Sequence, residues 1–328
     1  MFPDESTLKR WAREAGFCEC ALCSADAFEW AREKVTSQPQ LKERAQLRFA
    51  PREDHPQGRS LAVLLWPYAP AQTPEPGCVF VDSYYDASNA AYHAARQLEK
   101  RLLDAGCYAK ANVTYPAKSA AVRAGMGIIG HSGLLITHRY GTRVVIILMA
   151  VGIEAEEGRW SESGDATGCL SCGRCAKACP SGAIDETGMA HPERCLRNSM
   201  MEGVVVPPAL RERMGMRLIG CDMCQRVCPM QPKMPEAGGD RLPLDAFVTD
   251  DPAVFSATVS ALAARIGRNA ARPQRVRAQA AILAGNSGKP SYLPVLRGWE
   301  ASEFDTVRAH ARWAIGRIEA ARKPEREA

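Results

Sequence analysis

The sequence contains no long hydrophobic stretch. Its longest apolar run covers Val144 to Val151, whereas a membrane-spanning helix needs about 20 apolar residues. The first residues, MFPDESTLKRW, are polar and acidic and lack the apolar core of a secretory signal. We therefore expect no membrane span and no secretory signal, and we place the protein in the cytoplasm. Thiols stay reduced there, so we expect its cysteines to bind metal or to stay free.

Acidic residues are also missing from one long part of the chain, between residues 252 and 299. A chain with a net charge of +5 therefore has a strongly basic segment near its C-terminus. This segment contains five closely spaced arginines, namely Arg265, Arg268, Arg272, Arg275 and Arg277. A solvated helical face has this composition, and so has a surface that binds a polyanion such as nucleic acid.

Cysteine, in contrast, is abundant, and eight of the 13 cysteines lie between residues 169 and 228. The run from Cys169 to Pro180 has the spacing Cys-x2-Cys-x2-Cys-x3-Cys-Pro, by which bacterial ferredoxins hold a [4Fe–4S] cluster. The run from Cys221 to Pro229 is one cysteine short, and Cys195 lies alone between the two runs. In two-cluster ferredoxins, the cysteine before the proline binds the other cluster.

Exchanging the last cysteine of each run predicts two complete ligand sets. Cluster 1 would be held by Cys169, Cys172, Cys175 and Cys228, and cluster 2 by Cys179, Cys195, Cys221 and Cys224. Zinc is the alternative, because Cys-x2-Cys pairs also build zinc ribbons. Two zinc sites would need neither the Cys-Pro order nor the exchange, and four cysteines within eleven positions are too dense for separate disulfides. The sequence predicts an iron–sulfur protein that transfers electrons.

Three further cysteines, Cys18, Cys20 and Cys23, are spaced closely enough for a third metal site. They fall, however, in the apolar stretch 17–22, which predicts a strand. Free cysteine is among the most buried residue types. We therefore expect free cysteines in a core strand, and their role stays open.

The remaining patterns divide the chain into three predicted parts. Residues 1–160 alternate helical stretches (8–15, 87–104) with apolar strands (61–66, 134–137, 143–151), which is typical of an α/β domain with a largely covered sheet. Residues 161–235 form the cluster module, and 229–243 read as a linker. In residues 244–328, Val276-Arg-Ala-Gln-Ala returns as Val307-Arg-Ala-His-Ala, which indicates stacked helical hairpins of the HEAT kind.

A glycine-rich motif, Gly125-x-Gly127-x-x-Gly130, matches a dinucleotide-binding fingerprint. The residues before it read as a helix rather than a strand, and no acid follows about twenty positions later. We interpret the motif as a turn whose backbone approaches something bulky.

The order of these parts resembles the epoxyqueuosine reductase family over nearly the whole chain. Four stretches are similar to family motifs: Ala124 to Ser132, Cys195 within Glu-Arg-Cys-Leu, Ile219 to Pro229, and Arg277 to Asn286. The resemblance implies an N-terminal α/β cobalamin-binding domain, a bacterial ferredoxin-like double-cluster module and C-terminal HEAT-like repeats. It also implies a monomeric enzyme that takes electrons from a flavodoxin- or ferredoxin-type donor and reduces epoxyqueuosine to queuosine in transfer RNA, whose backbone the five arginines would bind.

By the same resemblance, the cobalamin pocket would be lined by Arg52, Tyr92, Gly130, His131 and Ser132. The family's proton-donating aspartate has no counterpart, because the stretch 110–116 contains no acid and Asn112 takes the nearest place. His131, Tyr115 or water would then supply the proton, although a histidine beside a glycine turn is more often a simple hydrogen-bond partner.

The missing acid leaves other functions open. A relative with the same cofactors could reduce a corrinoid or another small electrophile without acting on transfer RNA. A pure electron-transfer module with an empty pocket is the remaining alternative.

Overall fold

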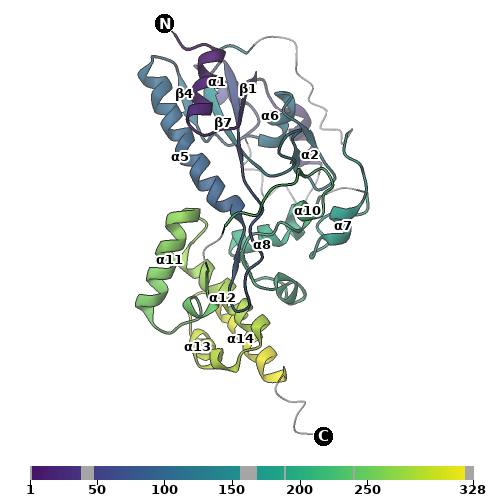
Figure 1. Ribbon diagram of the computed structural model, residues 1–328, viewed down its shortest axis with the longest axis vertical. Helices are drawn as coiled ribbons and strands as arrows, with labels where there is room; N and C mark the ends of the chain where they lie inside the picture. The colour runs from purple at the N-terminus through teal and green to yellow at the C-terminus, as the bar shows by residue number, and fades with distance from the viewer. Residues whose placement is uncertain (1, 38–47, 156–167, 188–189, 239–240, 322–328) are drawn as a thin grey trace.

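The computed structural model describes residues 2–37, 48–155, 168–187, 190–238 and 241–321. Its N-terminal part is built around a four-stranded sheet in the order β1-β2-β7-β4, in which all neighbouring strands are antiparallel (Figure 1). The strands are β1 (Glu19–Ser24), β2 (Ser60–Pro67), β4 (Ala109–Ala111) and β7 (Val144–Val151). The helices of this part are α1 (Glu5–Glu14), α2 (Glu29–Thr36), α4 (Pro51–Asp54), α5 (Ser83–Asp104) and α6 (Ala117–Arg123).

Helices cover both faces of this sheet. Successive residues of β2 point to opposite sides, so they join two different cores. Ala62 and Leu64 of β2 join the core formed with α1 and α5. Leu61, Val63 and Leu65 join the core formed with α2 and α6. The central strands β2 and β7 are largely buried on both faces, which explains why they read as continuous apolar runs rather than as alternating ones.

The cysteines of β1 follow this alternation. Cys23 is fully buried on the side of α2 and α6, while Cys20 packs on the side of α1 and α5. Side chains on opposite faces of a strand do not converge on one ion. The strand places Cys18, Cys20 and Cys23 as free thiols in or beside the core, as the apolar stretch predicts.

The glycine-rich motif forms a tight hairpin of β5 (Ile128–Ile129) and β6 (Leu135–Ile136) directly after α6. A Cβ atom on Gly127 would lie 2.3 Å from the carbonyl oxygen of Ile136, at a φ of +153°. Only glycine fits such an approach of two backbones. The helix before the motif and the close contact both match the prediction, and the bulky neighbour of Gly127 is the chain's own strand β6.

Among the described residues, the α-helices and strands of the cysteine-rich part are short: α7 (Arg174–Ala178), α8 (Leu196–Glu202), α9 (Pro208–Arg211), β8 (Arg217–Ile219) and α10 (Met223–Arg226). Strand β8 pairs in parallel with β3 (Phe80–Val81), which lies just before α5. This pairing joins the cysteine-rich part to the sheet domain at the N-terminal end of α5.

The C-terminal part is helical, with α11 (Pro252–Ile266), α12 (Pro273–Ser287), α13 (Leu293–Trp299) and α14 (Asp305–Ala321). The two copies of the internal repeat lie in α12 and α14, which pack against each other (Figure 1). A Cβ atom on Gly285 would lie 2.9 Å from the Cα of Ala314, so this glycine lets the two helices approach. One buried core contains residues of these helices and of α8 and β8. The predicted boundary between a cluster module ending at residue 235 and a repeat domain starting at residue 244 stays a prediction.

Among the described residues, no helix is long and apolar enough to cross a membrane.

Candidate iron–sulfur and cofactor site

The eight cysteines line two separate cavities. Cys169, Cys172, Cys175 and Cys228 face a small cavity of about 20 Å³, which is also lined by His131 and Ser132. Three of these cysteines surround the start of α7, and the fourth follows α10. The last cysteine of the second run thus joins the first three of the first run. This is the grouping that the spacing predicts for cluster 1.

The other four cysteines, Cys179, Cys195, Cys221 and Cys224, line a much larger cavity of about 400 Å³. Cys179 ends α7, Cys195 precedes α8, Cys221 follows β8, and Cys224 lies in α10. The isolated Cys195 therefore fills the place that is missing from the second run. Four short elements meet here, and one cysteine lies in or next to each of them.

Burial raises the pKa of thiols in both sets, including those of Cys175 and Cys228 in the first. It raises the pKa of Cys221 to about 11 and raises that of Cys224 further, with the other cysteines of the set adding to the effect at Cys224. A thiol must lose its proton to bind iron, so binding has to outweigh this cost.

Among the described residues, no three His, Cys, Asp or Glu side chains are placed to hold a single metal ion.

The cavity at the second set is also lined by apolar side chains. They are those of Leu134 and Leu135 at β6 and of Val144 and Ile146 in β7. The volume lies within the range of about 300–1,000 Å³ that is typical of cofactor and ligand pockets, which combine apolar walls with a few polar groups.

Two cationic side chains line this cavity. Lys118 of α6 donates a hydrogen bond to the carbonyl oxygen of Gly133. Desolvation, with the nearby Arg197 guanidinium adding to it, lowers the pKa of the Lys118 ammonium, while Cys195 opposes this shift. Arg197 stacks over Tyr84 at 4.7 Å and Tyr85 at 5.4 Å. Positive charge is therefore fixed beside the predicted cluster 2.

One acid also lines the cavity. Asp82 is 2% exposed, and burial raises its pKa to about 6. Its carboxylate accepts the backbone N–H of Tyr84 and so caps α5. Tyr68 lies nearby and donates a hydrogen bond to Gln225 at 3.0 Å.

Two of the predicted pocket residues, His131 and Ser132, line the cavities, and Gly130 lies next to a cysteine of the first set. Ser132 lines both of them, so its turn separates the two cysteine sets. His131 faces the smaller cavity, with its Nε2 3.3 Å from the Ser171 hydroxyl. A Cβ atom on Gly130 would lie 3.6 Å from the sulfur of Cys169. The predicted turn therefore packs directly against the first cysteine set.

The other predicted residues are not among those that line the two cavities. Arg52 forms an exposed ion pair with Asp26 at 3.2 Å. Tyr92 is 48% exposed on α5, where its carbonyl oxygen accepts the Asn112 amide at 3.5 Å.

Tyr115 is buried but points elsewhere, because its hydroxyl donates to the Asp54 carboxylate at 2.8 Å. Lys118, three residues further along the chain, reaches the cavity instead. Sequence reasoning missed it because a search for an acid passes over a lysine.

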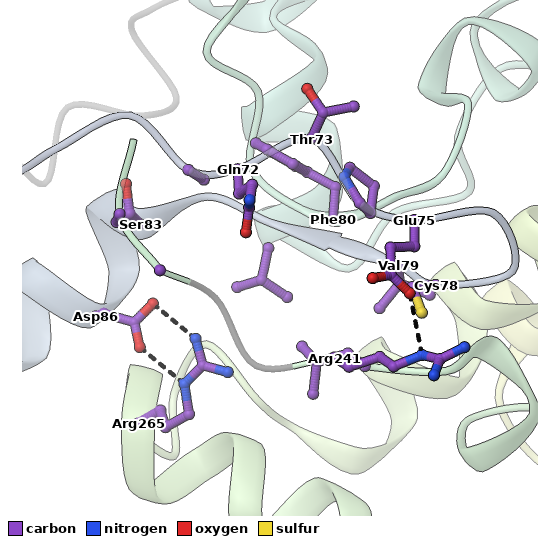
Figure 2. A pocket seen from close by; sticks show the side chains of 16 residues that line it. Gln72, Thr73, Glu75, Cys78, Val79, Phe80, Ser83, Asp86, Arg241 and Arg265 are labelled. Carbon is purple, nitrogen blue, oxygen red and sulfur yellow. Dashed lines mark hydrogen bonds and ion pairs between the residues drawn. The ribbon is translucent and has the colours of Figure 1, made fainter. Parts of the chain in front are cut away.

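The basic segment is largely engaged inside the molecule. Arg265 binds both carboxylate oxygens of Asp86 on α5, in the wall of a separate groove of about 410 Å³ (Figure 2). Arg275 is buried and donates to backbone carbonyls, and Arg277 lies 4.2 Å over the Phe255 ring. Of the five arginines, only Arg268 and Arg272 are exposed. We predicted that all five arginines bind a polyanion. Three of them make contacts within the protein, so the prediction now applies to Arg268 and Arg272.

Comparisons with known proteins agree with the prediction of two iron–sulfur clusters. Residues 168–231 match the family model of the 4Fe-4S double cluster binding domain. The epoxyqueuosine reductase of Gloeobacter violaceus is 31% identical over 254 residues, which cover 70% of this chain and 76% of that protein. The epoxyqueuosine reductase of Lactococcus garvieae is 34% identical over 111 residues, 34% of this chain and only 30% of that protein.

Solved structures share the fold. A crystal structure of epoxyqueuosine reductase with an epoxyqueuosine-modified tRNA-Tyr stem loop aligns with a TM-score of 0.79 at 22% identity, over 96% of this chain and 90% of that chain. The enzyme from Bacillus subtilis, with its catalytic loop swung out of the active site, aligns with a TM-score of 0.77 at 22% identity, over 98% of this chain and 95% of that chain.

The fold and the paired cysteine sets define a double-cluster iron–sulfur protein with an attached α/β domain. Within this class, the chain belongs to the epoxyqueuosine reductase family.

Proposed function

We propose that the protein is a cobalamin- and [4Fe–4S]-dependent reductase that converts epoxyqueuosine to queuosine in transfer RNA. The observation that carries this proposal is the cavity of about 400 Å³, which is lined both by four cysteines and by apolar side chains of β6 and β7. Four cysteine sulfurs need far less space than this cavity provides. The extra volume next to the cluster 2 ligands is where an electron-accepting cofactor would be held.

The residues present fit a corrinoid. A flat macrocycle needs an apolar surface, which Leu135, Val144 and Ile146 provide, and polar groups at its edge. Ser132, Lys118 and Arg197 line the cavity and would bind its amide side chains. When bound, cobalamin supplies a metal centre that accepts single electrons and reduces a carbon–oxygen bond. Arg52 and Tyr92 stay predictions for its outer parts, since neither lines the cavity.

The two cysteine sets suit a path for electrons from the surface to the cavity. Cys172 of the first set is exposed, whereas the second set faces the cavity. Under the proposal, each set holds one [4Fe–4S] cluster, which carries single electrons, and a flavodoxin- or ferredoxin-type protein supplies them. Removal of the epoxide oxygen as water takes two electrons and two protons.

Lys118 would deliver a proton, since Asp82, the acid that lines the same cavity, is engaged in capping α5. The Lys118 ammonium lines the cavity, and a lowered pKa makes it a better acid than an ordinary lysine. His131, Asn112 and Tyr115 stay predicted proton donors, but the first faces the smaller cavity and the other two line neither. Under this proposal, the missing aspartate is replaced by a lysine on the following helix.

The rest of the molecule would bind the RNA. Residues 1–160 would serve as the cobalamin-binding domain, 161–235 as the cluster module, and 244–328 as HEAT-like repeats that contact the RNA backbone. Arg268 and Arg272 are the arginines of the basic segment that are free to reach a phosphate. A monomer would be sufficient for this arrangement.

One observation favours a second function. No aspartate or glutamate occurs between residues 105 and 153, so the cavity wall from α6 to β7 offers no carboxylic acid as proton donor. A relative with the same cofactors that reduces a corrinoid or a small electrophile would not need one at that place.

A single experiment separates the two functions. The protein is reconstituted anaerobically with iron, sulfide and cobalamin, reduced, and given transfer RNA that contains epoxyqueuosine. We expect queuosine in the digested RNA, as detected by mass spectrometry. Unchanged epoxyqueuosine, together with reduction of a haloalkane or a free corrinoid by the same sample, would favour the second function.

A further inference from the structure

The first cysteine set lies at an edge of the molecule. Helix α7, which follows Cys172, stands on the outside, away from α5 and the C-terminal helices (Figure 1). Leu170 is 63% exposed, which is the largest exposed fraction among the described large hydrophobic side chains. Cys172 and Pro229 are exposed as well. An apolar surface thus surrounds a cysteine that is expected to bind a cluster.

Positive charge borders this surface. Arg174 and Lys177 of α7 are both exposed, and the sequence from Gly168 to Ile184 contains no aspartate or glutamate. Within the part of the chain that the structure describes, neither cation takes part in an ion pair. We name the group of Leu170, Cys172, Arg174, Lys177 and Pro229 the α7 surface.

We propose that the α7 surface is the docking site of a small acidic electron-carrier protein of the flavodoxin type. This inference rests on the proposed function, since only a redox enzyme needs such a partner, and it adds the place where the partner binds. Redox encounters use small and weak interfaces, in which a few apolar contacts bring the centres together and opposite charges guide the approach. The α7 surface combines both features at the more exposed cysteine set.

The charges commit the site to an acidic partner. A basic carrier would be repelled by Arg174 and Lys177, and an uncharged one would gain nothing from them. Transfer RNA is the competing polyanion. Transfer RNA could bind these two cations, but its binding would not depend on Leu170 and it would not deliver electrons. The experiment below therefore distinguishes an electron carrier from transfer RNA.

The experiment measures electron transfer into the reconstituted protein without cobalamin or RNA. Reduced bacterial flavodoxin is mixed with the protein in a stopped-flow instrument, and bleaching of the cluster absorbance gives the rate. For the double variant Arg174→Glu and Lys177→Glu, we expect a rate about tenfold lower at low salt. The difference should shrink as salt screens the charges. The variant Leu170→Ser should slow transfer at every salt concentration.

Two controls make the result specific. Lys100→Glu changes one exposed charge on α5, a helix that lies away from α7 (Figure 1), and should leave the rate unchanged. Photoreduced deazariboflavin is small and uncharged and should reduce every variant at the wild-type rate, which shows that the clusters are intact. Equal flavodoxin rates for wild type and the double variant, with equal iron contents, would overturn the proposal. That result would leave the proposed function untouched, because substrate turnover is measured separately.

Discussion

The two cysteine sets provide the same ligands in opposite surroundings. The first set closes on a cavity of about 20 Å³ and includes an exposed cysteine, whereas the second faces about 400 Å³ of space between the cluster module and the sheet. Chemically alike clusters would therefore have different tasks. Under the proposed function, one would receive electrons from outside, and the other would pass them to whatever fills the cavity. Position in the fold, rather than ligand type, separates their roles.

The most severe test of this difference removes one ligand from each set. Cys172→Ala and Cys224→Ala should each lower the iron content by about four atoms per chain, because each set is expected to hold one [4Fe–4S] cluster. Only Cys224→Ala should also change the absorption spectrum of added cobalamin, since only cluster 2 would lie beside it. Equal spectra for the two variants would contradict the assignment of the cavity to cluster 2.

Substitution of the cavity lysine should have the next largest effect. Lys118→Met removes the ammonium, and we expect epoxyqueuosine reduction to fall about 100-fold, as is typical of losing a general acid. Lys177→Met removes a comparable cation from the α7 surface and should keep turnover when the reductant is deazariboflavin.

The pH profile gives Lys118 a signature of its own. An ammonium loses its proton as pH rises, and a lowered pKa makes this loss begin at a lower pH than for an ordinary lysine. Activity should therefore decline on the alkaline side. Lys118→Arg keeps the positive charge, but a guanidinium does not give up its proton, so this variant should lose turnover as Lys118→Met does. Full activity of Lys118→Arg would exclude Lys118 as the proton donor.

The smallest expected effect concerns the arginines. Arg268→Ala and Arg272→Ala should each reduce the dependence of transfer RNA binding on salt by about one phosphate contact. Arg265→Ala breaks the ion pair with Asp86 and should leave this dependence unchanged. Filter-binding measurements over a range of salt concentrations would check both. If only Arg265→Ala changed the salt dependence of transfer RNA binding, Arg268 and Arg272 would not be the phosphate contacts.

Local patterns in the sequence predicted a large part of this molecule. The strand 61–66 is found as Ser60–Pro67 and the helix 87–104 as Ser83–Asp104, because continuous apolar runs and helical periodicity mark such elements. The cysteines that line each cavity are those that the exchanged Cys-Pro ligand of two-cluster ferredoxins predicts, and their role as cluster ligands stays a prediction.

Contacts between distant segments could not be predicted in the same way. Composition presented the arginines as one basic patch, but Arg265 meets Asp86 only because α11 packs beside α5. Tyr115 is turned away by Asp54, which lies 61 residues earlier in the chain. Lys118 reaches the cavity because α6 lies next to the β5–β6 hairpin. Each of these outcomes depends on packing that no local pattern encodes.

The most direct test of the account is the iron and acid-labile sulfide content of the anaerobically reconstituted protein. Two [4Fe–4S] clusters predict about eight iron and about eight sulfide per chain. Two zinc ions per chain without sulfide would contradict the account, because neither cavity would then hold an electron carrier.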